Sequence, residues 1–525
     1  MFPLVAFLVA SSLYVVALSF YRLYFHPLAG VPGPKLAALT GWYEAYYDLV
    51  AGGHGGQMTF HIQKLHKQYG KIVRINPHSV HIDDADYFSA IYTAREGFDR
   101  PEYVRWRFGS PHALISTPDH HAHKLKRKVQ EPFFAKGRIA KLAPMIWAKA
   151  NKMCRTLSRE YAGNGRPVRL DNMFACLVAD VATQYSFDRD YSWLEMDGFE
   201  SPFLQAIVGF KKLAHPATYF PWMARALVSI PDSVVRFLQP SRSTVLDFQD
   251  DMRDMVRGAQ SDVEIEKAEG ISIDPDQVER DKTIIHGILR SGLPGEELEV
   301  EQLKDHAAAL LAGGVASTVW TLSLASYHII NDRDVMKKLR AELEAAMPDS
   351  NMPLTVEELG RLPYLMACID EALRLAPGQM ARSPRISKKA MVYGTHTLPA
   401  GTHISLDAWH MHHNEAIFPS SFEFRPERWL NQPQAPPPYE ARPLKAYLVS
   451  FSRGTRNCLG LNLANAEMSI ALAALFRRFD WELFETTYDA DVKVVRDLIA
   501  PEVPITTKGI RALVTDIGGR PFHSH

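Results

Sequence analysis

A cysteine segment near the C-terminal end carries the strongest chemical signal in the sequence. It reads FSRGTRNCLG over residues 451–460 and precedes a predicted helix over Asn462–Phe479. A thiolate at a helix N-terminus receives backbone N–H donors and the positive end of the helix dipole, which lower its pKa. Gly454 permits a turn that other residues resist, and Gly460 lets a flat ligand approach the helix closely. The segment therefore predicts that Cys458 is a thiolate bound to a metal ion.

The side chains around Cys458 suit a flat, acidic metal ligand. Phe451 can shield the sulfur from water, and Arg456 can reach an anionic group on the ligand. The pattern F-x-x-G-x-R-x-C-x-G resembles the haem-binding loop of cytochromes P450 at every fixed position. The resemblance implies a haem b whose iron has Cys458 as its axial ligand. It also implies four further haem-binding residues: Phe451, Gly454, Arg456 and Gly460. The alternative is a buried structural cysteine before a helix.

A second match concerns an ion pair upstream of the cysteine. Glu371 and Arg374 form E-x-x-R on a predicted helix over Val356–Leu375. Alone, this spacing indicates only a surface pair between neighbouring turns. Because Arg428 follows in the segment FRPERW at 424–429, the resemblance implies a three-way ion pair that holds the core beside the haem.

Three basic residues match positions that contact haem propionates in similar proteins. The segment Asp119–Ala135 predicts a basic helix, where the family places W-x-x-x-R. This chain has His123 and Arg127 at that spacing, and a histidine can also donate a hydrogen bond. Arg385 matches a further propionate-binding arginine. The alternatives are an ordinary surface histidine and an exposed loop charge.

The same basic helix carries Lys124, Lys126 and Lys128 around Arg127. A run of charge is usually a solvated face. In the family that this chain resembles, the helix borders the side of the haem where an acidic reductase docks. The resemblance therefore implies salt-sensitive docking of NADPH-cytochrome P450 reductase, with cytochrome b5 as a second candidate electron donor.

The predicted helix Asp305–Ile330 both matches and departs from the family pattern. The glycine pair at 313–314 fits the helix over the haem, where it leaves room for oxygen. Ala316 stands where an acid is expected, and Ser317 replaces the usual threonine, with Thr318 after it. Oxygen activation needs protons, and a hydroxyl can relay them through water. We therefore expect Ser317 and Thr318 to be catalytic, with the acidic source elsewhere or supplied by water.

The remaining chain positions these residues with a mainly α-helical fold and small β-sheets, typical of the cytochrome P450 fold. Residues 71–83 alternate as a short hairpin. Polar composition predicts surface loops at Ser261–Glu279 and Asn431–Pro443. Helical spacing recurs in three further segments: Ile139–Tyr161, Ser243–Val256 and Val335–Met347.

Composition restricts the partners and the compartment. The 525 residues include 59 Lys and Arg against 59 Asp and Glu, so no net charge favours nucleic acid as a partner. The four cysteines are too few and too dispersed for a disulfide framework, which favours a reducing compartment.

The N-terminus predicts a membrane anchor. No charged residue occurs from Phe2 to Phe20, and this length nearly matches a ~30 Å hydrocarbon core. Positive charge begins only at Arg22, which favours a single span in the endoplasmic reticulum membrane with the catalytic domain facing the cytoplasm. We expect an anchor over residues 1–21, a proline-rich hinge over 22–40, and one haem-thiolate catalytic domain over 41–525. A cleaved signal peptide is the alternative.

The functional prediction is a cytochrome P450 monooxygenase that oxidises a hydrophobic small molecule with O2 and electrons from NADPH. The stretches 36–50 and 72–77 resemble fungal members of secondary metabolism, which implies a terpenoid or polyketide substrate. Ala316 leaves open a reductase-independent isomerase, dehydratase or peroxygenase. A non-catalytic haem sensor or carrier is the third reading.

Overall fold

Helix α15 (Val300–Asn331) spans 32 residues and runs through the helical part of the molecule. In this computed structural model, which describes residues 2–200, 202–238, 243–269 and 283–516, α15 packs against α9, α13, α18 and α20. Its residues are apolar on most sides, which is the pattern of a helix enclosed by others. The predicted helix at 305–330 is therefore confirmed and extended at both ends.

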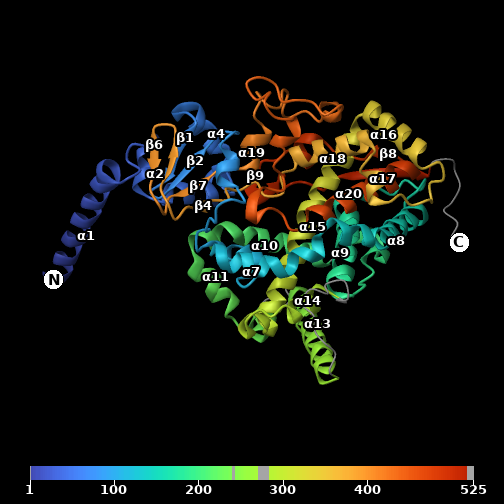
Figure 1. Ribbon diagram of the computed structural model, residues 1–525, viewed down its shortest axis with the longest axis horizontal. Helices are drawn as coiled ribbons and strands as arrows, with labels where there is room; N and C mark the ends of the chain where they lie inside the picture. Colours follow the sequence, from blue (N-terminus) through green and yellow to red (C-terminus); the bar gives the residue numbers. More distant parts are fainter. Residues whose placement is uncertain (1, 201, 239–242, 270–282, 517–525) are drawn as a thin grey trace.

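The helices form the larger part of the fold (Figure 1). In the first half of the chain they are α1 (Phe2–Phe20), α2 (Lys35–Leu39), α3 (Trp42–Leu49), α4 (Met58–Tyr69), α5 (Phe88–Ile91), α6 (Val104–Arg107), α7 (His120–Gln130), α8 (Lys136–Glu160), α9 (Leu170–Phe187), α10 (Pro202–Tyr219), α11 (Pro221–Val228), α12 (Asp232–Leu238) and α13 (Ser243–Ala268). In the second half, besides α15, they are α14 (Ile284–Arg290), α16 (Arg333–Ala346), α17 (Val356–Leu359), α18 (Pro363–Leu375), α19 (Ala408–His412) and α20 (Leu461–Arg478).

The strands β1, β2, β4, β6 and β7 lie at the end of the molecule from which α1 projects, whereas β8 lies at the opposite end (Figure 1). A four-stranded sheet has the order β1-β2-β7-β4, in which β1 and β2 form the predicted hairpin and β2 pairs in parallel with β7. A three-stranded sheet, β3-β11-β8, and two two-stranded ones complete the set. The strands are β1 (Ile72–Asn76), β2 (Ser79–Ile82), β3 (Val168–Arg169), β4 (Arg385–Ile386), β5 (Met391–Tyr393), β6 (His396–Leu398), β7 (His403–Ser405), β8 (Phe479–Leu483), β9 (Arg496–Leu498), β10 (Ala500–Glu502) and β11 (Arg511–Asp516).

Two predicted segments differ from the structure. The single helix expected over Val356–Leu375 is two helices, because Gly360 ends α17 and Pro363 begins α18. The loop expected over Ser261–Glu279 is helical as far as the end of α13, and its residues 270–279 lie outside the described part. In α13 the acidic face pairs with α14, since Asp262 lies 3.3 Å from His286.

The helical backbone of the predicted anchor continues into the start of the predicted hinge. A π-helical turn carries the chain from α1 to Phe25, and His26 then adopts an extended conformation. Pro27 follows, and because proline has no backbone N–H, it cannot donate the hydrogen bond that would continue a helix. The predicted hinge also contains one short helix, α2.

Candidate active site

A cavity of about 470 Å³ lies between α15, α7 and the cysteine segment. Nearly all of the predicted site residues contribute to its wall, although they come from distant parts of the chain. They are His123, Arg127, Ser317, Thr318, Arg385, Phe451, Arg456, Cys458 and Gly460. Cys458 lies deep in the molecule, and its side chain is accessible where the cavity opens onto it.

The cysteine segment is folded back on itself. The Cys458 amide donates to the Phe451 carbonyl at 2.8 Å. Gly454 lies outside the cavity lining and has a φ of +75°, and a Cβ there would lie 2.4 Å from the Thr93 carbonyl oxygen. The turn therefore requires a glycine at position 454, and the contact of Gly454 with haem stays a prediction.

The prediction of a lowered thiol pKa is only partly right. Burial raises the pKa of Cys458, while a hydrogen bond from the Gly460 amide and the charge of Arg127 act in the opposite direction. Burial outweighs these two contributions because a thiolate loses its hydration in the interior. A bound cation is what would make the anionic sulfur stable here, which agrees with a metal ligand.

Basic side chains with unpaired nitrogens gather along one side of the cavity. Arg100, His123 and Arg385 are buried and Arg456 is half-buried, and the His123 Nδ1, the Arg456 Nε and two nitrogens of Arg100 have no hydrogen-bond partner. Burial and the neighbouring arginines lower the pKa of His123 to about 2 and that of Arg456 to about 10. Such a group of buried donors requires an anion.

Arg100 is a site residue that the sequence interpretation missed. Its pKa lies well below the usual range because the side chain is buried beside Arg385 and Arg456. It stands alone in a segment without helical periodicity, so no spacing signalled it. Only the fold brings it to the other arginines.

Arg127 has a different environment from the other basic residues. It donates to the carbonyl of Asn457 at 2.7 Å and to the side-chain oxygen of Asn457 at 2.6 Å. It also pairs with Glu131 at 3.2 Å. Arg127 therefore ties α7 to the residue that precedes Cys458.

These features fit a haem. The unpaired donors suit propionates, and the buried thiol suits an iron ligand. A Cβ added to Gly460 would meet no atom within 4 Å and would enter the cavity instead, so this face of α20 is open to a flat ring.

The α15 side of the cavity has hydroxyls and no acid. The Ser317 Oγ donates to the Gly313 carbonyl at 3.0 Å. Among the described residues, the acids in the lining are Asp407 and Glu467, both far from α15 in sequence. Asp407 lies 3.0 Å from the His81 Nε2, whereas one oxygen of Glu467 has no partner. The sequence pattern around Ala316 does not indicate that Asp407 or Glu467 would lie in the cavity wall.

The predicted ion pair beside the core is present. Glu371 accepts two hydrogen bonds from Arg374, at 2.8 and 2.9 Å, and both side chains are fully buried. Arg428 donates to Glu371 at 2.9 Å, and so does the Trp429 indole. The three-way arrangement is confirmed, and Trp429 is an additional partner.

One lysine of the expected surface patch is not solvated. Lys124 and Lys128 are exposed, but Lys126 is buried. The Lys126 ammonium lies 2.7 Å from Glu297 and donates to the His112 carbonyl at 2.8 Å. The solvated basic face of α7 is therefore smaller than predicted.

The comparisons with known proteins agree with this geometry. The family model described as "Cytochrome P450" matches residues 41–508. The chain belongs to the cytochrome P450 family. It is 38% identical over 504 residues to "Cytochrome P450 monooxygenase orf4" of Eupenicillium brefeldianum, covering 95% of this chain and 96% of that one. It is 33% identical over 500 residues to "Cytochrome P450 monooxygenase TRI4" of Fusarium sporotrichioides, covering 94% and 92%.

Cytochromes P450 use a haem whose iron is bound by a thiolate, and they typically receive electrons from NADPH through a reductase. This chain is thus a cytochrome P450 monooxygenase. The segment Pro3–Phe25 is long and apolar enough to cross a membrane and is not buried, so it is a candidate anchor. Helix α15 is also long and apolar enough to cross a membrane, but it is half buried inside the fold.

Proposed function

We propose that this cytochrome P450 inserts one oxygen atom of O2 into a hydrophobic small molecule, with electrons from NADPH delivered by a reductase. One observation carries the proposal: a single cavity combines Cys458 with the unpaired donors of Arg100, His123 and Arg456. The fungal source of the similar monooxygenases favours a secondary metabolite as substrate, such as a terpenoid or polyketide.

Each cavity residue has a part in this proposal. Cys458 binds the iron, and Phe451 excludes water from the sulfur. When bound, haem supplies the iron at which dioxygen is activated. Arg127 positions the cysteine segment through Asn457. The propionates would be held by four basic side chains of the cavity wall: Arg100, His123, Arg385 and Arg456.

The hydroxyls of Ser317 and Thr318 hold protons on the α15 side of the cavity. Ser317 keeps its oxygen at the wall through its bond to Gly313. Because Ala316 cannot ionise, we propose that water supplies protons to the Ser317 Oγ.

The protein also needs a membrane and an electron donor. We propose that residues 1–21 anchor it in the endoplasmic reticulum membrane, that residues 22–40 form the hinge, and that 41–525 form the catalytic domain on the cytoplasmic side. NADPH-cytochrome P450 reductase, and cytochrome b5 as a second donor, would dock near the exposed Lys124 and Lys128.

The absence of an acid on the cavity face of α15, among its described residues, favours a second candidate. A reductase-independent haem-thiolate enzyme, such as an isomerase, dehydratase or peroxygenase, would not need proton delivery to dioxygen. Ala316 is the residue that supports it.

The test is turnover by the full chain co-expressed with a reductase and supplied with terpenoid and polyketide precursors. We expect product only when NADPH, reductase and O2 are all present. Product that forms when none of the three is present supports the second candidate instead. Cys458→Ala should abolish the red-shifted Soret band of the reduced carbon monoxide complex. The matched control Cys368→Ala, at a buried cysteine outside the cavity lining, should keep the band.

A further inference from the structure

Arg107, the last residue of α6, is a buried cation in the cavity wall. Only 3% of its surface is exposed, and its Nε has no hydrogen-bond partner. Its Nη1 makes a long contact of 3.5 Å with the Arg382 carbonyl, and its guanidinium lies 5.5 Å from the centre of the Tyr103 ring. Within the described part of the chain, no carboxylate forms an ion pair with it.

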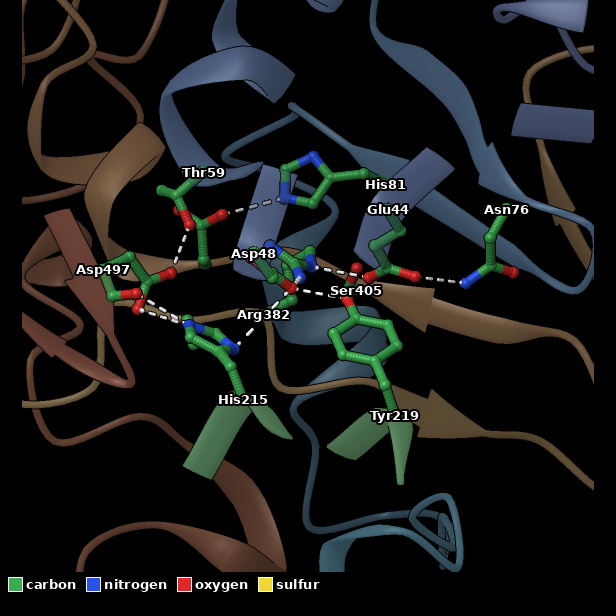
Figure 2. Close-up of polar contacts among 12 residues, drawn as sticks. Glu44, Asp48, Thr59, Asn76, His81, His215, Tyr219, Arg382, Ser405 and Asp497 are labelled. Carbon is green, nitrogen blue, oxygen red and sulfur yellow. Dashed lines mark hydrogen bonds and ion pairs between the residues drawn. The ribbon is translucent and has the colours of Figure 1, made fainter. Parts of the chain in front are cut away.

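The acids nearest to this region are already paired. Figure 2 shows Glu44 and Asp48 converging on Arg382, which donates to Glu44 at 3.0 Å and also to Asp48. Tyr219 donates to Asp48 at 2.6 Å, and Asn76 donates to the other oxygen of Glu44 at 2.6 Å. Both carboxylates are therefore held by other donors, and Arg107 is left without an anion from the protein.

A haem would not neutralise Arg107 either. Its two propionates would be matched by Arg100, Arg385 and Arg456 together with His123, and the charges acting most strongly on His123 come from Arg456, Arg127, Arg100 and Arg385. Arg107 acts instead on Arg100 and Tyr103. The other arginines already outnumber the two propionates, so Arg107 remains a buried positive charge in the cavity wall.

We infer that Arg107 is a substrate-binding residue and that the substrate carries a carboxylate. This inference rests on the proposed monooxygenase function and names a substrate class for it. A carboxylate matches the guanidinium with two parallel hydrogen bonds and relieves the unpaired charge. Since Arg107 and the glycine pair at 313–314 line the same cavity, the apolar body of such an acid would extend toward α15.

A second cavity supports an amphipathic acid. It measures about 480 Å³ and is lined by Arg107 together with Trp42 and Phe220. Arg22, at the base of the candidate anchor, also lines it. Arg107 thus lies in the wall of both cavities. An acid that partitions into a membrane could there give up the hydrogen bonds between its carboxylate and water and bind the guanidinium instead.

The test uses purified holoenzyme and matched acid and ester probes: dodecanoic acid with methyl dodecanoate, and abietic acid with methyl abietate. Binding is measured as the shift of the Soret band. We expect the wild type to bind an acid about 10- to 100-fold more tightly than its ester, the range of a charged hydrogen bond. Arg107→Gln should abolish this preference and leave ester affinity unchanged, and Arg107→Lys should restore part of it. The control Arg105→Gln, on the same helix but half-exposed and paired with Glu102, should behave as wild type.

Three results would overturn the inference. The first is no acid preference in the wild type for either pair, including no binding at all. The second is an unchanged preference in Arg107→Gln. The third is loss of haem from Arg107→Gln with equal weakening of acid and ester, which would make Arg107 a propionate ligand. A wild type that lacks the red-shifted carbon monoxide band would instead refute the proposed function.

Discussion

At the scale of single residues, the cavity depends on two hydroxyls where an acid would be expected. The Ser317 Oγ donates to the Gly313 carbonyl at 3.0 Å, which fixes the position of the hydroxyl. Thr318 is buried beside it and lines the same wall.

Ser317→Ala should separate electron use from product formation. Without the hydroxyl, proton relay fails while substrate and haem still bind, so product per NADPH consumed should fall by about tenfold or more. Ser317→Thr, which keeps a hydroxyl, should retain most of the coupling. The measurement is product yield against NADPH oxidation and peroxide release, and equal coupling in Ser317→Ala and wild type would contradict the relay.

Two glycines of the cysteine segment should respond differently to alanine. Gly454→Ala forces a side chain into positive φ and against the Thr93 carbonyl, so it should destabilise the fold by about 1–2 kcal/mol or more. Gly460→Ala meets no protein atom and should leave the apoprotein stable, but its methyl group enters the cavity and should weaken haem retention. Thermal unfolding and haem content measure the two effects, and equal loss of stability in both variants would count against this division.

At the scale of elements, the ion pair on α18 joins that helix to the segment before the cysteine. Burial alone would raise the pKa of Glu371, but the hydrogen bonds from Arg374 and the charge of Arg428 hold it below its ordinary value. Glu371 is thus ionised inside the core and depends on its partners.

Arg374→Ala should cost about 3–5 kcal/mol, because it leaves a buried carboxylate uncompensated. The matched control is Arg361→Ala on the neighbouring turn, where the pair with Glu357 at 2.6 Å is 72% and 69% exposed. That change should cost at most about 1 kcal/mol. Urea unfolding measures the free energy of unfolding of both variants. Similar losses would show that burial does not make the α18 ion pair cost more to break than the exposed one.

A histidine on α19 connects α18 to the residues just before the cysteine segment. The His412 Nδ1 donates to the Arg374 carbonyl at 2.9 Å, and its Nε2 accepts from the Val449 amide at 2.9 Å. Burial and the charge of Arg374 lower the pKa of His412 to about 3. A second ring proton would face the Val449 N–H, so the neutral ring is the folded form.

Acid should therefore destabilise the protein through His412. In the unfolded chain the ring titrates near pH ~6.5, so between about 6.5 and 3 the unfolded state binds more protons. The contribution of the neutral His412 ring to the free energy of unfolding is fully present above that window and should fall by about 1.4 kcal/mol per pH unit within it. His412→Gln keeps one donor and one acceptor without titrating, and its unfolding free energy should decline less steeply from pH 7 to 5. Identical slopes would contradict the assignment.

The elements that sequence patterns predict best are those with long apolar periodicity. Residues 305–330 and 139–161 are helices as expected, because their apolar faces repeat over many turns. The α17–α18 boundary was missed because the apolar spacing continues across Gly360 and Pro363. The end of α13 was missed because its acidic residues resemble a loop until α14 supplies His286 as a partner.

At the scale of the whole molecule, a motif predicted the metal ligand, but the charge balance of the cavity came from unrelated segments. Arg100 and Arg107 lie in a stretch with no repeating pattern, and both have buried nitrogens that find no hydrogen-bond partner in the described part of the chain. Pairing of this kind depends on contacts such as that between Arg382 and Asp48, which are 334 positions apart. Spacing along the chain cannot reveal them.

The boundary between the anchor and the rest of the molecule can be located from two hydrogen bonds. Arg22 donates to the Leu39 carbonyl, and the buried Arg74 donates to the Arg22 carbonyl at 3.0 Å. Among the described residues before Arg22, at positions 2–21, no side chain makes a hydrogen bond to the folded part, and α1 is exposed along most of its length. Arg22 therefore belongs to the folded part, although it lies near the end of the candidate membrane span Pro3–Phe25.

Two N-terminal truncations should therefore differ in stability but not in sedimentation. Removing residues 2–20 should move the protein from the membrane pellet to the supernatant and leave its stability and carbon monoxide band intact. Removing residues 2–26 should have the same effect on sedimentation but cost about 1–3 kcal/mol, since the buried Arg74 loses an acceptor. Sedimentation and thermal unfolding of both forms measure this. Equal stability would show that Arg74 gains another acceptor, and membrane association that persists in both would show that α1 is not the only segment that binds the bilayer.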